Sequence, residues 1–129
     1  MTEPRWITQR GLMLLQEESL AEHGGLAGIR DAGMLESALA RPRNLFAYDG
    51  ISDLARLASS YAFGIAKNHP ILDGNKRAAF AAAGLFLLKN GMELSAAQPE
   101  AYAFVMGLAS SEIGEEEFAG WIRANIRPK

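Results

Sequence analysis

The chain lacks several features that would assign it to particular classes of protein. It contains no cysteine among its 129 residues, which excludes disulfide bonds, thiolate chemistry and a cysteine-based zinc site. Its formal net charge is −2, so it lacks the basic excess of a general nucleic-acid binder. Its longest apolar run, from Ala78 to Leu88, is too short to cross a bilayer, and Met1 to Trp6 carry no apolar signal region. We therefore expect a cytoplasmic protein that neither enters a membrane nor binds nucleic acid directly.

What remains is the composition of an ordinary globular domain. Apolar residues make up 49% of the chain and charged residues 22%, and the length is sufficient for one domain with a sizeable core. Helical periodicity dominates, and alternating strand patterns are few. We predict an all-α fold, a single compact domain over residues 1–129 with about six helices and with strands minor or absent.

Capping residues and helix breakers define the expected boundaries of these helices. Thr8, Asp31 and Ser52 are predicted N-caps, Gly24-Gly25 is predicted to end the first helix, and Pro42 is predicted to stop the second. The predicted helices span residues 9–23, 32–41, 53–68, 75–89, 99–109 and 115–126, with a short extended piece at 92–94 and an irregular or only briefly helical segment at 43–51.

One polar loop concentrates the chemistry of the chain. The stretch HPILDGNKR, residues 69–77, leads directly into the apolar helix predicted at 75–89. A helix N-terminus presents free backbone N–H groups and the positive end of the helix dipole, which suits a phosphate. Lys76 and Arg77 fall on the first turn, where cations are unfavourable unless an anion lies nearby. The simplest interpretation is that an anion binds there.

The first half of this loop offers a base and a metal ligand. His69 stands at the loop entrance, where an imidazole can act as a general base near neutral pH; alternatively, it is a helix C-terminal histidine that stabilises the dipole. Asp73 can bind Mg²⁺ that bridges phosphate oxygens, or it is an ordinary turn aspartate before glycine. Of Ile71 and Leu72, one is expected to point inward and anchor the loop to the core.

The second half of the loop offers phosphate ligands. Gly74 permits a positive φ and lets a ligand approach the backbone, although a simple turn also explains it. Asn75 is a predicted N-cap, and it can donate to a phosphate only if its amide is not already used. Lys76 supplies a point charge and Arg77 a bidentate fork, both suited to a polyphosphate; otherwise they are solvated surface charges.

These residues resemble a known family. HPILDGNKR is similar to the active-site motif of the Fic/Doc superfamily, whose Fic branch usually has glycine at the position of Lys76 and a second arginine at that of Phe80. Both differences favour the Doc branch, the death-on-curing toxins. The similarity extends over GGLAGIRDAGMLESALARP and AKNHPILDGNKRAAFAAAGLFLLKNG, and so over most of the chain.

The resemblance implies a protein kinase that is the toxin of a toxin–antitoxin pair. Such enzymes transfer the γ-phosphate of ATP to a threonine of elongation factor Tu and so halt translation, with ATP inverted relative to its placement in Fic adenylyltransferases. By motif position, His69 is implied to be the base, Asp73 a Mg²⁺ ligand, and Asn75, Lys76 and Arg77 phosphate ligands, with backbone N–H groups around Gly74. The implied antitoxin is a small protein whose C-terminal segment folds as a helix into a groove of the toxin.

Two departures from the family pattern bear on efficiency. The family usually has phenylalanine where this chain has Ile71, and often threonine where it has Ala78, so the loop could be packed differently. The self-inhibitory Fic pattern (S/T)xxxE(G/N) has its nearest match at 111–116, which ends in glutamate, so inhibition is expected from a partner. Two alternatives to the kinase stay open: a Fic-type protein adenylyltransferase, and a catalytically degenerate nucleotide- or protein-binding module.

Other side chains have structural interpretations or stand near the expected partner site. The irregular segment 43–51 is a candidate flap beside the antitoxin groove, although its three large apolar residues, Leu45, Phe46 and Tyr48, could equally be core. His23 is expected to cap the first helix. Trp6 and Trp121 are expected to be packing residues, and residues 115–117 a solvated acidic helix start.

Overall fold

The computed structural model describes residues 2–129, and within them the fold is a helical domain with one small sheet. The all-α prediction, with strands as a minor feature, is confirmed. The elements in chain order are α1 (Gln9–His23), α2 (Ala32–Asp49), α3 (Leu54–Asn68), α4 (Asn75–Lys89), β1 (Met92–Leu94), α5 (Gln98–Ser110), α6 (Glu115–Ala124) and β2 (Ile126–Pro128).

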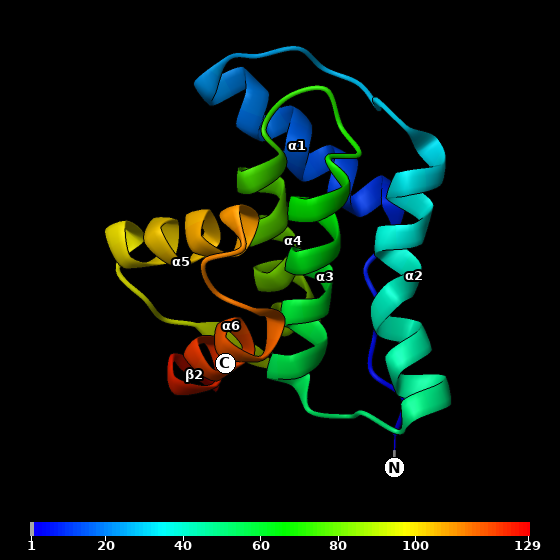
Figure 1. Ribbon diagram of the computed structural model, residues 1–129, viewed down its shortest axis with the longest axis vertical. Helices are drawn as coiled ribbons and strands as arrows, with labels where there is room; N and C mark the ends of the chain where they lie inside the picture. The colour runs from blue at the N-terminus through cyan, green and yellow to red at the C-terminus, as the bar shows by residue number, and fades with distance from the viewer. Residues whose placement is uncertain (1) are drawn as a thin grey trace.

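Helix α3 forms the centre of the domain. It packs against α2, α4, α5 and α6, and Figure 1 shows it beside α4, with α2 on one side and α5 and α6 on the other. Small residues along α3 allow these close approaches. At Gly64 an added Cβ would lie 3.2 Å from Cα of Ala38 on α2, so only glycine permits this spacing without displacement.

The core is continuous and aromatic at its centre. Tyr61 and Phe86 are fully buried, with ring centroids 5.3 Å apart, and Trp6 stacks on Phe86 at 5.8 Å. Trp121 stacks on Phe104 at 4.8 Å. The packing roles expected of the two tryptophans are therefore confirmed.

Helix α2 does not end where the sequence pattern indicated. It continues through Pro42 to Asp49, so the predicted stop at residue 41 is wrong, and residues 43–49 are helical rather than irregular or only briefly helical. Leu35, Ala38 and Pro42 are buried on one face of this helix, and Leu45 packs against the same core. The free energy gained by burying these side chains on both sides of the proline offsets the loss of the backbone hydrogen bond that proline cannot donate.

Two of the three large apolar residues in the segment 43–51 pack inward. Leu45 is half-buried against the core, and Phe46 lies edge-on to Trp6 with ring centroids 5.8 Å apart. Tyr48 alone is solvent-exposed, at 83%. The interpretation of Leu45 and Phe46 as packing residues is the correct one.

The C-terminal region also departs from the prediction. Helix α6 ends at Ala124 rather than at residue 126, and residues 126–128 form β2, which pairs antiparallel with β1 through Leu94 opposite Ile126. At the start of α3 the N-cap is Asp53, not Ser52, and its carboxylate pairs with Arg123 of α6 instead of capping its own helix.

Glu115 at the start of α6 is not the solvated residue that was expected. Its side chain is 11% exposed and accepts hydrogen bonds from Arg41 of α2 and Arg56 of α3. Burial by itself would raise the pKa of Glu115, but the hydrogen bonds and charges of Arg41 and Arg56 outweigh it and hold that pKa below its usual value. The network ties three helices together.

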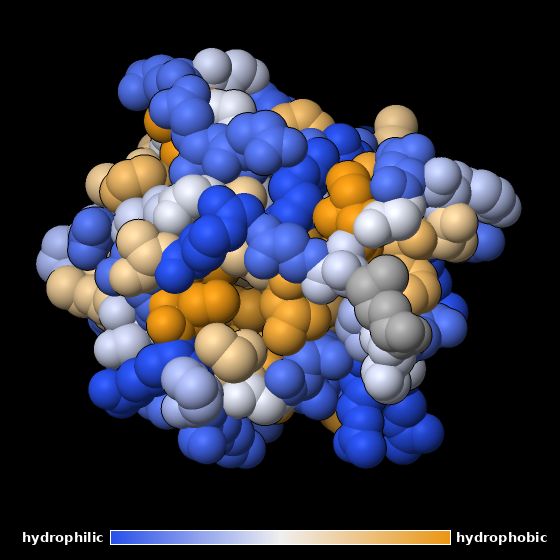
Figure 2. Space-filling view, turned by 90° about the horizontal axis from the view of Figure 1, so that it is seen from below, coloured by the Kyte–Doolittle hydropathy of each residue, from blue (hydrophilic) through white to orange (hydrophobic). Residues whose placement is uncertain are grey.

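The two ends of the bundle differ in character. The loop at 69–74 lies at the upper end in Figure 1, where α3 leads into α4. Seen from the opposite end, apolar side chains gather in the middle of the face and hydrophilic ones surround them (Figure 2). No helix within residues 2–129 has both the length and the apolar character needed to span a bilayer.

Candidate active site

The candidate site begins with His69 at the C-terminus of α3. His69 has φ 47° and ψ 55°, a left-handed conformation, although it directly precedes Pro70. This conformation ends the helix and lets the His69 N–H donate to the Ile65 carbonyl at 3.2 Å. The imidazole is left exposed at the mouth of the loop, free to approach a substrate.

A second arginine, which sequence reasoning missed, stabilises this helix end. Arg30, in the segment before α2, donates from Nε to the His69 carbonyl at 2.6 Å and from Nη2 to the Asn68 carbonyl at 2.8 Å. Carbonyls at a helix C-terminus have no partner within the helix, and a cation there also complements the dipole. Arg30 therefore holds the backbone that carries His69.

The side chain of Ile71 anchors the loop to the core. It is 2% exposed, whereas Leu72 is 46% exposed, so the expectation that one of the two points inward is confirmed for Ile71. Ile71 also forms an isolated antiparallel bridge with Ile29, and the Leu72 N–H donates to the Gly28 carbonyl at 3.1 Å. The loop is thus supported by the core and by the segment before α2.

Asp73 and Gly74 form the turn into α4. The Asp73 carboxylate accepts the Leu26 N–H at 2.7 Å through Oδ2, and its backbone carbonyl accepts from Nε2 of Gln16 at 2.6 Å. Gly74 has φ 79° and is the N-cap of α4. A Cβ at Gly74 would lie 2.9 Å from Nε2 of Gln16 and 3.2 Å from Nη2 of Arg77, so the backbone approaches both side chains closely.

Gln16 is the second residue that sequence reasoning missed. It is 3% exposed and lies on the buried face of α1, four residues after Leu12. A polar side chain in an apolar stripe is the signal that could have found it, because buried polar groups nearly always have a hydrogen-bond partner.

The Asn75 amide is directed to the loop and not to the helix end. The Ile71 N–H donates to Oδ1 of Asn75 at 3.2 Å, and Nδ2 of Asn75 donates back to the Ile71 carbonyl at 3.0 Å. The predicted N-cap at Asn75 is therefore wrong, and Gly74 takes that position. Only one of the two amide hydrogens of Asn75 remains for a phosphate.

Lys76 and Arg77 are exposed on the first turn of α4, which contains no acidic residue. Arg77 donates from Nε to Oγ of Ser19 at 3.1 Å, and within the described part of the chain neither cation forms a salt bridge. Two unneutralised cations at the positive end of a helix dipole form a strong site for an anion.

These residues converge on one hollow. A cavity of about 400 Å³ is lined by His69, Leu72, Asp73, Gly74, Asn75, Lys76, Arg77 and Tyr102. All the site residues predicted from the sequence line it except Ile71, which supports it. Tyr102, contributed by α5, is a lining residue that no sequence motif marked.

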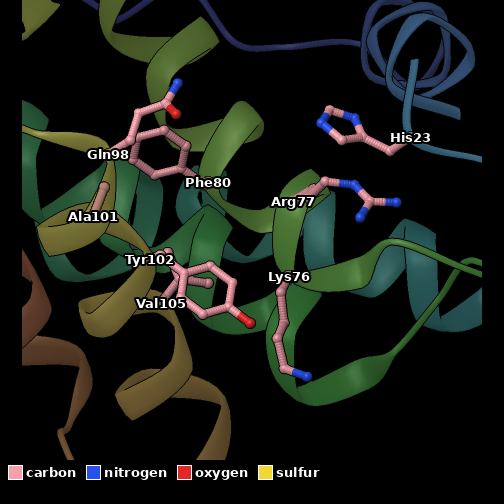
Figure 3. Close-up of a pocket in the computed structure, with 8 residues that line it drawn as sticks. All are labelled: His23, Lys76, Arg77, Phe80, Gln98, Ala101, Tyr102 and Val105. Atoms are coloured by element: carbon pink, nitrogen blue, oxygen red, sulfur yellow. The ribbon is translucent and has the colours of Figure 1, made fainter. Parts of the chain in front are cut away.

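A second, more apolar hollow of about 480 Å³ adjoins the first (Figure 3). It is lined by His23, Lys76, Arg77, Phe80, Gln98, Ala101, Tyr102 and Val105. Nδ1 of His23 forms a hydrogen bond with the Ser19 carbonyl at 3.1 Å in the last turn of α1, next to the C-cap residue Gly24.

The fold and the site together define a class: a helical domain that presents a histidine and two cations at the N-terminus of a buried helix. A family model described as the Fic/DOC family matches residues 6–87, and the chain belongs to this family.

Two curated relatives agree with that assignment. "Protein kinase doc" of Escherichia phage P1 is 33% identical over 119 residues, which cover 92% of this chain and 94% of the relative. "Toxin Doc" of Mycolicibacterium smegmatis (strain ATCC 700084 / mc(2)155) is 42% identical over 74 residues, which cover 57% of each chain. Both relatives carry the name Doc, as Lys76 and Phe80 indicated.

Proposed function

We propose that this chain is the toxin of a toxin–antitoxin pair and acts as a protein kinase. Its substrates would be ATP and a threonine hydroxyl of a translation factor of the elongation factor Tu type, and it would act in the cytoplasm. The observation that carries the proposal is the hollow lined by the exposed His69 together with Lys76 and Arg77, two cations that form no salt bridge within residues 2–129. The names of the two relatives support it.

The residues of the hollow match the steps of phosphoryl transfer. His69 would accept the proton of the threonine hydroxyl as the oxygen bonds to the γ-phosphorus. The bond between the γ-phosphorus and the bridging oxygen to the β-phosphate breaks, and ADP leaves. Lys76, Arg77 and the free N–H groups of α4 would stabilise the charge on the transferred group, which is the main task in this reaction.

The donor set at Asp73 fits a magnesium ion. Within residues 2–129 no cluster of three or more His, Asp or Glu could hold a metal, and Mg²⁺ usually binds through one or two carboxylates together with substrate phosphates. The Asp73 carboxylate gives one lone pair to Leu26 and retains others. Asp73 would therefore hold Mg²⁺, which when bound offsets the charge of the phosphates.

The proposed regulator is an antitoxin that docks a helix on this domain. The match to the self-inhibitory Fic pattern ends in Glu116, and Glu115 forms salt bridges with Arg41 and Arg56. Inhibition from a separate chain accords with that arrangement.

Transfer of label from ATP tests the reaction directly. The purified chain is incubated with elongation factor Tu and ATP labelled at either the α- or the γ-phosphate. We expect γ-label on a threonine, and His69→Ala should lower the rate by about 10²–10⁴-fold, as loss of a general base typically does. Tyr48→Ala, at an exposed position on α2 outside the hollow, is the control and should transfer label normally.

Each other outcome contradicts the proposal in a distinct way. Transfer of α-label would assign an adenylyltransferase. Binding of ATP without transfer to any protein would assign a degenerate binding module. Near-normal transfer by His69→Ala would remove His69 as the base.

A further inference from the structure

The segment before α2 is joined to the loop at 69–74 through its backbone. The N–H groups of Arg30 and Asp31 both donate to the carbonyl of the buried Pro70, at 2.8 and 3.1 Å. On the other side of this contact the Leu72 N–H donates to the Gly28 carbonyl at 3.1 Å. These bonds fix the backbone of residue 30 against the loop, so its side chain extends from a defined position.

From this position the Arg30 side chain reaches the end of α3. Its Nε donates to the His69 carbonyl at 2.6 Å and its Nη2 to the Asn68 carbonyl at 2.8 Å. A planar guanidinium presents these donors in a fixed fork, so the two bonds together define where both carbonyls lie. Arg30 lines neither of the two hollows. Any effect of this side chain on a bound substrate must therefore pass through the backbone of His69.

The backbone of His69 is in a conformation that requires such support. Its φ of 47° and ψ of 55° lie in the left-handed region, which is uncommon for residues other than glycine. Such a conformation costs free energy and persists where the surrounding structure holds it. These torsion angles also set the direction in which the imidazole leaves the chain. A group that holds the backbone of His69 therefore holds its ring as well.

We infer that Arg30 is a positioning residue for phosphoryl transfer, because its guanidinium keeps His69 in the left-handed conformation and so places the imidazole. This inference rests on the proposed function for the role of His69 as the base, and adds the group that holds the base in position. Since Arg30 lines neither hollow, its loss should lower kcat and leave the KM for ATP unchanged.

Steady-state transfer of γ-phosphate to elongation factor Tu tests this role in Arg30→Ala, Arg30→Lys and Asn68→Ala. Arg30→Ala should lower kcat about 10–100-fold, since a displacement of about 1 Å can cost that much. Arg30→Lys supplies a point charge for a two-donor fork and should fall between the two. Asn68→Ala is the matched control. It removes another bond between α3 and α2, from Nδ2 to the Met34 carbonyl at 3.1 Å, and should keep the kcat of the unmodified chain.

Chemical rescue separates positioning from a loss of fold. Arg30 is exposed, so free guanidinium can reach the place of the deleted side chain. Guanidinium chloride at a non-denaturing concentration should restore part of the kcat of Arg30→Ala, and sodium chloride at the same concentration should not.

NMR of the two histidines supplies a readout that needs no substrate. In Arg30→Ala the ring signals of His69 should shift and broaden, and the His69 N–H, which donates to the Ile65 carbonyl at 3.2 Å, should exchange faster. His23, in the last turn of α1, should keep its signals and thereby report an intact fold.

Three results would overturn the positioning role. They are an unchanged kcat in Arg30→Ala, an equal loss of kcat in Arg30→Ala and Asn68→Ala, and unchanged ring signals of His69 in Arg30→Ala. If Arg30→Ala does not fold, the same criteria apply to Arg30→Lys. Failure of the unmodified chain to transfer γ-phosphate would overturn the proposed function, and the ring signals of His69 would then decide by themselves whether Arg30 positions this residue.

Discussion

Gln16 is a buried side chain that forms a hydrogen bond with the backbone of the loop at residues 69–74. Its Nε2 donates to the Asp73 carbonyl at 2.6 Å, and the residue is 3% exposed. Gln16→Leu has nearly the same volume but no donor, so the Asp73 carbonyl would lose its partner in the folded loop. An unsatisfied buried acceptor costs about 1–3 kcal/mol.

The effect should be confined to the loop. Leucine removes the cost of burying a polar amide on α1, and this gain offsets the lost hydrogen bond. The free energy of global unfolding should therefore change little. The free energy of local opening of the loop, by contrast, should fall by about 1–3 kcal/mol. Amides that are protected only while the loop is closed should then exchange roughly 5–150-fold faster. Two such amides are those of Leu26, which donates to Asp73 Oδ2 at 2.7 Å, and Leu72, which donates to Gly28 at 3.1 Å.

Native-state hydrogen exchange measured by NMR checks this prediction. The matched control is Gln9→Leu, the same substitution at an exposed position on the same helix. It should leave the exchange rates of Leu26 and Leu72 as they are. If Gln16→Leu also leaves both rates unchanged, the hydrogen bond to Asp73 does not order the loop and the reasoning fails.

Three further predictions follow from the same structure. Arg77→Ala should weaken ATP binding about tenfold or more, and Arg77→Lys should restore it only in part, because a point charge does not replace a bidentate fork; unchanged affinity in both variants would refute the role. Ile71 is 2% exposed, so Ile71→Ala should lower stability by about 2–5 kcal/mol through a cavity and Ile71→Phe by about 1–3 kcal/mol through overpacking, and a wild-type melting curve for Ile71→Ala would contradict the anchoring. The depressed pKa of Glu115 means that its ion pairs stabilise the fold above the ordinary carboxyl pKa of 4.5 and are lost as pH falls through the lower folded-state value. Glu115→Gln should therefore melt below the wild type at pH 7, with the difference shrinking in acid; a difference that does not depend on pH would exclude this account.

The helices with clear caps and breakers were predictable from the sequence because these signals are local. The bounds of α1 and α4 agree with the prediction, as do the Thr8 cap, whose side chain accepts the Gly11 N–H at 3.0 Å, and the strand at 92–94. Local signals failed where a distant contact outweighed them. Pro42 predicts a helix end by itself, but packing of α2 on α3 carries the helix past it.

The sequence did not predict strand β2 or the ion pairs of Glu115, for a related reason. β2 exists because residues 126–128 meet β1, more than thirty positions earlier in the chain. From the sequence, Glu115 is predicted to be an acidic residue that stabilises a helix N-terminus. Arg41 and Arg56 contact it only because α2 and α3 pack against α6. No periodicity within α6 contains that information.

The sequence by itself determined the chemical groups of the site and their order, because residues 69–77 are contiguous and directly precede a helix. The tertiary structure decided how those groups are used. It committed the Asn75 amide to Ile71, placed Gln16 and Arg30 against backbone 57 and 39 residues away, and brought Tyr102 to the hollow lined by His69 and Arg77. A side chain's hydrogen-bond partner and its exposure depend on which elements pack against it, and the packing of α1 and α5 around α4 is a property of the folded chain.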